Sequence, residues 1–172
     1  MTFEQFRNNV ESWAEVRGIY EHSTALAQAL KAVSEVGELA DAVIKNDRTA
    51  LIDTIGDVAV CLVNVARMTG TAPRVGVVRN TTSKPIDVVA ASVCKTVSDL
   101  ALMVGVYQSS GSCPEEIGAY DNLTDQIGYT LGHLSMLCGC DQLDFEQCCE
   151  SALSEIKDRK GRMVAGGAFV KE

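Results

Sequence analysis

The chain has 172 residues and a formal net charge of −8, and it is 47% hydrophobic but only 5% aromatic, with three prolines. Such a length can bury one good core, and this composition favours a helical bundle packed with Ala, Val and Leu. The negative charge argues against a protein that binds nucleic-acid polymers, because it would repel their phosphate backbones.

The seven cysteines predict free thiols in a reducing cytoplasm. Their number is odd, and most of them fall in apolar helical segments. Zinc is the alternative, but the cysteines at 138–140 and 148–149 lack zinc-site spacing, and His22 and His133 complete no such pattern. The first residues show no signal-peptide pattern and no apolar run looks long enough for a membrane, so we expect a cytoplasmic location and no membrane partner.

Helical periodicity dominates the chain, and no strand pattern is evident. Thr2 followed by Gln5 is typical of a capping box, Asn46-Asp47 breaks a helix, Gly70 ends one and Pro85 begins another. The expected helices cover about 3–17, 23–45, 48–69, 85–108, 115–138 and 144–158. The sequence therefore predicts an all-α bundle of about six helices, followed by an irregular, partly basic tail.

A faint internal repeat relates two parts of this bundle. LIDTIGD at 51–57 resembles LTDQIGY at 123–129, and KAVSEVGEL at 31–39 resembles KTVSDLALM at 95–103. A degenerate duplication and a chance match between two amphipathic helix pairs both explain this likeness. We expect one domain over 1–172, with ligand-bearing helices in 3–70, a degenerate second helix pair in 85–138, and a C-terminal helix with a basic tail in 141–172.

Two pairs of carboxylates stand where an interior is expected. Glu35 and Glu38 are three residues apart, and Asp53 and Asp57 are four apart, so each pair lies on one helix face. Asp57 is surrounded by apolar residues, where a lone carboxylate must be paired, protonated or bound to a cation. Four carboxylates on facing helices predict an all-oxygen site for a hard divalent metal, Mg²⁺ or in its place Mn²⁺.

Lys31 and Asn64 fall on the same helix faces as these carboxylates. An amide inside an apolar run needs a partner, so the cluster predicts a pocket for a metal–nucleotide complex. The alternative for Glu35, Glu38, Asp53 and Lys31 is an ordinary solvated helix face.

These residues resemble a known family, the MazG-like all-α nucleoside triphosphate pyrophosphohydrolases, and especially its phage-type members. The likeness rests on EVGELADA at 35–42, on GDV at 56–58 leading to Asn64, on WAEVRGI at 13–19, and on the C-terminal EIKDRKGRMVAGGAFVKE. It implies a MazG-like four-helix core and Mg²⁺-dependent hydrolysis of a nucleoside triphosphate to the monophosphate and pyrophosphate.

The resemblance also implies roles for single residues. Glu35, Glu38 and Asp57 would hold metal, with Asp53 as a fourth ligand, and one glutamate would orient the attacking water. Lys31 and Asn64 would touch phosphate or sugar. The further substrate-binding candidates are Trp13, Arg17 and His22 around the base, and Lys157, Arg159, Lys160 and Arg162 around the triphosphate. Trp13 also fits the apolar stripe of its helix, His22 a loop, and the basic group an ordinary helix end.

Two departures from the family pattern leave alternatives open. Ser34 and Thr54 stand where glutamates are expected, although Asp53 can replace the second as a ligand. One alternative is a catalytically silent nucleotide-binding or interaction module, and another is a base-selective dUTP or dCTP diphosphatase. We expect a homo-oligomer, a dimer or a tetramer, because single-unit relatives build their four-helix core from paired chains; a phage-encoded chain would act in the host cytoplasm.

Overall fold

A computed structural model describes residues 1–72, 84–109, 119–159, 161–164 and 169–171. The chain is all-α, as predicted. Its helices are α1 (Phe3–Val16), α2 (Ile19–His22), α3 (Ala25–Lys45), α4 (Arg48–Thr69), α5 (Ile86–Ser109), α6 (Ala119–Cys140) and α7 (Phe145–Ile156). Six of them agree with the expected helices to within about four residues.

A short helix and a two-stranded hairpin were missed by the sequence analysis. The short helix α2 lies in the expected link between the first two helices, after Gly18 with φ +69°, a conformation that glycine adopts without strain. The tail expected to be irregular contains strands β1 (Gly161–Met163) and β2 (Phe169–Lys171), which pair antiparallel with Arg162 opposite Val170. Both elements are too short to carry a periodic hydrophobic pattern.

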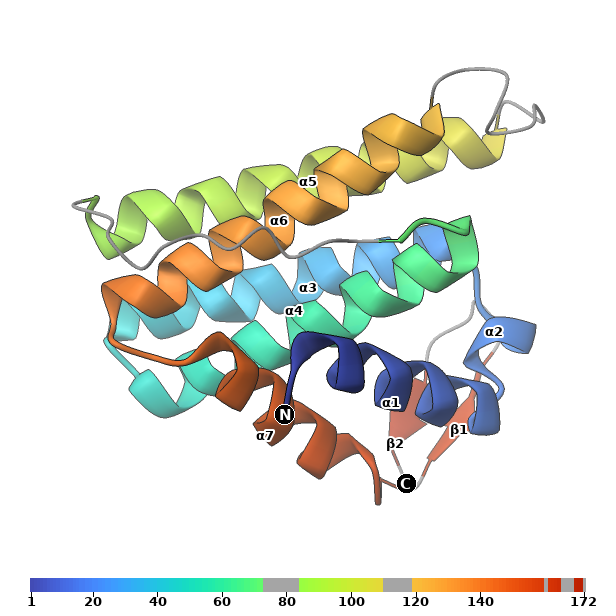
Figure 1. Cartoon of the computed structure of the whole chain (residues 1–172), viewed down its shortest axis with the longest axis horizontal. Helices are drawn as coiled ribbons and strands as arrows, with labels where there is room; N and C mark the ends of the chain where they lie inside the picture. The colour runs from blue at the N-terminus through green and yellow to red at the C-terminus, as the bar shows by residue number, and fades with distance from the viewer. Residues whose placement is uncertain (73–83, 110–118, 160, 165–168, 172) are drawn as a thin grey trace.

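The helices stack in three layers (Figure 1). The α5–α6 pair forms one outer layer, α3 and α4 form the middle one, and α1 with α7 forms the other outer layer. The closest helix pairs agree with this order, because α3 packs on α4 and α5, and α4 packs on α7 and α1. Helix α4 is therefore covered from both sides.

The α3–α4 pair is joined by a two-residue link whose sequence explains its geometry. Asn46 ends α3 in a left-handed conformation with φ 53°, and Asp47 begins α4 by accepting a hydrogen bond from the Ala50 amide at 3.1 Å. The Thr24 hydroxyl caps α3 in the same way, and Gly70 ends α4. These caps fix how the polar faces of the two helices meet.

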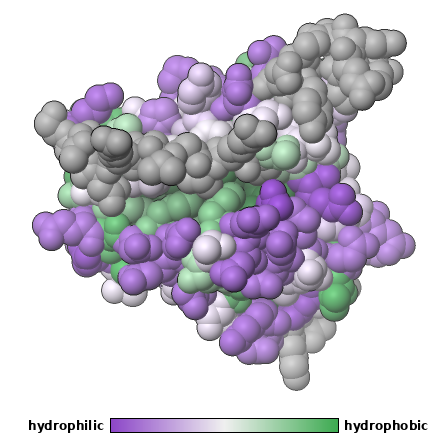
Figure 2. Space-filling view, in the orientation of Figure 1, coloured by the Kyte–Doolittle hydropathy of each residue, from purple (hydrophilic) through white to green (hydrophobic). Residues whose placement is uncertain are grey.

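The expectation that no apolar run reaches membrane-spanning length was wrong. By length and composition alone, α4 and α5 are both long and apolar enough to cross a membrane. Most of α4 is buried inside the bundle, which accounts for its apolar character as a core helix. On the face drawn in Figure 2, apolar surface crosses the middle of the molecule, with hydrophilic surface below it over α1 and α7.

Gly56 allows α7 to approach α4 closely. A Cβ placed on Gly56 would lie 2.5 Å from the Cβ of Ala152 and 2.6 Å from the carbonyl oxygen of Cys148. A neighbouring backbone cannot yield as a flexible side chain can, so only glycine permits this contact. The contact holds the middle of α7 against α4 at the residue next to Asp57.

We predict that Gly56→Ala lowers the free energy of unfolding by about 1–3 kcal/mol, because it overpacks the α4–α7 contact. Gly37→Ala is the matched control, since a Cβ there meets nothing within 4 Å and should stabilise α3 by about 0.5–1 kcal/mol. Urea unfolding followed by circular dichroism measures both changes. Equal stabilisation by the two substitutions would contradict the close α4–α7 approach.

Candidate functional site

Glu35 is the most deeply buried carboxylate of the predicted set, with only 5% of the residue exposed. The ammonium of Lys31, one helical turn earlier on α3, forms an ion pair with its Oε1. Burial lowers the pKa of Lys31, but the hydrogen bond and the charge of Glu35 outweigh it and raise the pKa above its ordinary value. Lys31 therefore stays protonated beside Glu35.

Asp57 is partly buried on α4 next to this pair. Burial, followed by the charge of Glu35, raises the pKa of Asp57 from 3.8 to about 6, while Arg159 acts in the opposite direction. This influence places the Asp57 carboxylate of α4 within electrostatic reach of Glu35 on α3.

The other two predicted ligands lie nearer to solvent. Glu38 and Asp53 are both exposed. Partial burial and the charge of Glu155 raise the pKa of Asp53, and Arg159 opposes them. Thr54, which stands where the family has a glutamate, is buried and donates its hydroxyl to the Ala50 carbonyl at 2.9 Å. The Thr54 hydroxyl is thus bonded to the backbone of its own helix, α4.

The donor chemistry of this cluster suits a hard cation. Carboxylate oxygens from two helices are available, and at least Glu35 already binds a positive charge, the ammonium of Lys31. Within the residues that the structure describes, no three His, Cys, Asp or Glu side chains are grouped so that they could hold one metal ion. The four-carboxylate metal site expected from the sequence therefore stays a prediction.

Asn64 has partners on both sides, as its buried position requires. Its Oδ1 accepts a hydrogen bond from the Tyr20 hydroxyl at 3.1 Å, and its Nδ2 donates to Gln28 Oε1 at 3.1 Å. Gln28 Nε2 in turn donates to the Ser23 hydroxyl at 3.0 Å. This chain of bonds, here called the Asn64 network, fastens α2 to the α3–α4 pair.

Tyr20 and Gln28 were missed by the sequence analysis. Gln28 follows the same face of α3 as Lys31 and Glu35, at a spacing of three and seven residues, so a polar stripe facing Asn64 was the available signal. Tyr20 gave no such signal, because it belongs to a helix of only four residues. Burial is the main cause that raises the pKa of Tyr20, which keeps its hydroxyl a hydrogen-bond donor.

Trp13 and Arg17, predicted near the base, are placed against the end of α7. The indole N–H of Trp13 donates to the Ile156 carbonyl at 3.0 Å, and Arg17 donates to the Lys157 carbonyl at 3.3 Å. These carbonyls would otherwise lack helical partners. The two side chains therefore fix the point where the chain leaves α7 toward Arg159.

Arg159 is the basic residue that the structure brings to the acidic cluster. Its guanidinium donates to Glu155 Oε1 at 3.0 Å, and its charge opposes the raised pKa of both Asp53 and Asp57. Lys157 is exposed beside it, and His22 is exposed with its Nε2 3.7 Å from Glu21. Lys160 and the side chain of Arg162 lie outside the described residues.

The described cysteines agree with the free thiols that the sequence predicts. Cys61, Cys94, Cys138, Cys140, Cys148 and Cys149 are free, and Cys113 lies outside the described residues. Burial raises the pKa of Cys61 between Lys31 and Asp57, so this thiol stays neutral beside the acidic cluster.

The geometry defines an all-α protein with a carboxylate-rich site between two central helices. Residues 23–88 match the model of the MazG nucleotide pyrophosphohydrolase domain. This match covers the segment that contains Glu35, Glu38, Asp53 and Asp57, and it bears out the family resemblance there. That description indicates nucleotide pyrophosphohydrolase chemistry.

A phage protein is similar to part of this chain. An uncharacterized 18.2 kDa protein in the rep-hol intergenic region of Haemophilus phage HP1 is 41% identical over 64 residues, which cover 37% of this chain and 39% of that protein. This relative supports the expectation of a phage-type member. No solved structure matches the chain.

We predict that Asp57→Asn stabilises the metal-free protein at pH 7 by about 1–2 kcal/mol. Folding raises the pKa of this carboxyl from 3.8 to about 6, so its contribution to stability is complete below pH 4 and is lost as the pH rises through 6. Because asparagine does not ionise, Asp57→Asn removes this loss of stability at higher pH. Urea unfolding in EDTA at pH 4 and pH 7 measures the effect, and a variant less stable than the wild type at pH 7 would contradict it.

Proposed function

We propose that the chain is a Mg²⁺-dependent nucleoside triphosphate pyrophosphohydrolase that cleaves between the α and β phosphates. The observation that carries this proposal is the buried Glu35 beside Asp57, within the segment that matches the MazG domain. Burial and the charge of Glu35 raise the pKa of Asp57, and a carboxylate in such surroundings is destabilising unless a cation offsets its charge.

The chain's own groups supply both signs of charge that the reaction needs. Glu35 and Asp57 would hold Mg²⁺, with Glu38 and Asp53 completing the set, and the metal would supply positive charge to the phosphate oxygens. Lys31 pairs with Glu35, Arg159 lies within electrostatic reach of Asp57, and both would bind phosphate oxygens. One of the glutamates of α3 would orient the attacking water.

Capping of α7 supports the role proposed for Arg159. Trp13 and Arg17 hold the carbonyls of Ile156 and Lys157, only three and two residues before Arg159. Arg159 is therefore fixed at the base of the acidic cluster rather than carried on a free tail. A guanidinium held in this way is suited to binding phosphate, because little rotamer entropy is lost on binding.

We predict that incubation with Mg²⁺ and ribo- or deoxyribonucleoside triphosphates yields the monophosphate and pyrophosphate. Asp57→Asn should lower kcat/KM at least about hundredfold while the helical circular dichroism is kept, because the site loses its central negative charge. Asp125→Asn is the matched control, since Asp125 is exposed on α6 and removes the same charge. Chromatography of the products with Mg²⁺, Mn²⁺ and EDTA gives the readout.

Two results would contradict the proposal. Release of orthophosphate would place the cleavage at another bond, and equal activity of Asp57→Asn would remove this carboxylate from the site. Absence of turnover with every nucleotide and both metals would instead favour the silent binding module, for which the hydroxyl of Thr54 in place of a glutamate is the supporting observation.

A further inference from the structure

Most of the exposed large apolar side chains lie on two neighbouring helices. Among the residues that the structure describes, seven such side chains are exposed, and five of them belong to α3 or α5. They are Leu30, Ile44, Val88, Leu102 and Val106, with exposed fractions between 48% and 81%. Single exposed apolar residues are ordinary, whereas a group of them on one surface indicates contact with another molecule.

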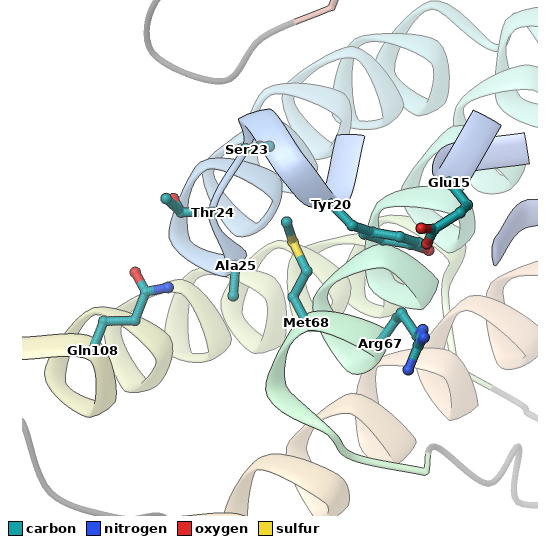
Figure 3. Close-up of a pocket in the computed structure, with 8 residues that line it drawn as sticks. All are labelled: Glu15, Tyr20, Ser23, Thr24, Ala25, Arg67, Met68 and Gln108. Atoms are coloured by element: carbon teal, nitrogen blue, oxygen red, sulfur yellow. The ribbon is translucent and has the colours of Figure 1, made fainter. Parts of the chain in front are cut away.

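Helices α3 and α5 pack side by side and run in opposite directions. Gln108, near the end of α5, lines the same pocket as Thr24, which precedes α3 (Figure 3). Farther along the pair, the Cys94 thiol of α5 donates to the Val36 carbonyl of α3 at 3.8 Å. The apolar residues at the start of α5 therefore lie beside the end of α3, and those at the end of α5 lie beside the start of α3.

The exposed apolar residues of α3 are on the side of the helix that borders α5. Leu30, Gly37 and Ile44 follow one another at intervals of seven residues, so they share one side of α3. Leu30 lies one turn after Leu26, whose side chain is 3.6 Å from a Cβ placed on Gly105 of α5. This side of α3 and the outer side of α5 therefore form one continuous surface, here called the α3–α5 face.

The outer side of α5 carries exposed residues at intervals of three and four along most of its length. They are Val88, Ala91, Lys95, Ser98, Leu102 and Val106. This spacing is typical of a helix that packs lengthwise against another helix. The small side chains of Ala91 and Ser98 leave grooves between the larger ones, into which the side chains of a partner helix can fit.

This stripe of α5 is complementary to itself when two copies run in opposite directions. Lys95 and Asp99 lie two residues on either side of Val97. Val88 and Val106 lie nine residues on either side of it. A two-fold axis at the level of Val97 therefore places each lysine opposite the aspartate of the second copy, and each of the outer valines opposite the other. Lys95 and Asp99 already pair within the chain, so a dimer would join two ion pairs into one network.

We propose that the α3–α5 face binds a second copy of this chain, with the two α5 helices antiparallel. Two adjacent helices about 10 Å wide and about 30 Å long offer about 600 Å² per copy, so the dimer would bury about 1,200 Å², at the lower end of specific interfaces. Helices α3 to α6 already pack together within one chain, so this contact is additional to their bundle.

A membrane is a poorer partner for the same face. Helix α5 is long and apolar enough to cross a bilayer by length and composition alone. Its exposed stripe, however, has the Lys95–Asp99 pair at the middle, and burial of these charges in lipid is costly. A second copy of the chain instead supplies an opposite charge to each of them.

The first test compares Val106→Lys with Val16→Lys in the full chain, by sedimentation velocity at increasing protein concentration. Both valines are exposed on helices, and α1, which carries Val16, lies in the opposite outer layer (Figure 1). We expect the wild type to dimerise and Val106→Lys to raise the dissociation constant about tenfold or more, because both copies lose an apolar contact. The control, Val16→Lys, should change it less than about twofold.

The second test examines the antiparallel register through the charges at its centre. Lys95→Glu and Asp99→Lys should each raise the dissociation constant at least about fivefold at low salt, because like charges then face each other across the dimer. An equimolar mixture of the two variants should dimerise as tightly as the wild type, since the two lysines of one chain face the two carboxylates of the other. The ion pair within each chain stays broken in this mixture, so recovery reports the contact between chains.

Several results would overturn the proposal, and none of them depends on nucleotide hydrolysis. A wild type that stays monomeric would exclude the dimer, and one that instead sediments with phosphatidylcholine vesicles would assign the face to a membrane. A dimer that Val106→Lys leaves unchanged would use another surface. A mixture of Lys95→Glu and Asp99→Lys that associates no better than either variant alone would exclude the antiparallel pairing of α5.

Discussion

The packing of α4 on both of its faces is the constraint on which the rest of the structure depends. α3 covers one side, and α7 with α1 covers the other, so its residues from Ile55 to Ala66 are buried except for the partly exposed Asp57. Every polar group on such a helix has to be bonded within the protein or matched by charge. Asp57 and Asn64 are the two positions where that requirement shapes the surroundings.

The two positions meet the requirement in different ways. Asn64 is neutral, and its amide has a partner at both atoms, Tyr20 at Oδ1 and Gln28 at Nδ2. Asp57 faces a second carboxylate, and among the described residues the charge of Arg159 opposes the rise in its pKa. This contrast supports the functional role proposed for the Asp57 carboxylate, because buried ionisable groups commonly mark active sites.

Much of this architecture could be predicted from the sequence, because it rests on local signals. The capping residues Thr2 and Asp47 and the stop at Gly70 set helix ends that agree with the structure. The carboxylate faces followed from helical spacing. Other features depend on contacts between distant segments, which leave no periodic trace. These include Trp13 at the end of α7, the close approach at Gly56 and the partnership of Tyr20 with Asn64.

The binding of a divalent cation at Glu35 and Asp57 is the central claim, and thermal unfolding tests it without relying on turnover. The melting temperature of the full chain would be measured with EDTA and with increasing Mg²⁺, for the wild type and for Asp57→Asn. Because a ligand that binds only the folded state stabilises it, Mg²⁺ should raise the melting temperature of the wild type and leave the variant unchanged. An equal response of the two proteins would contradict the claim.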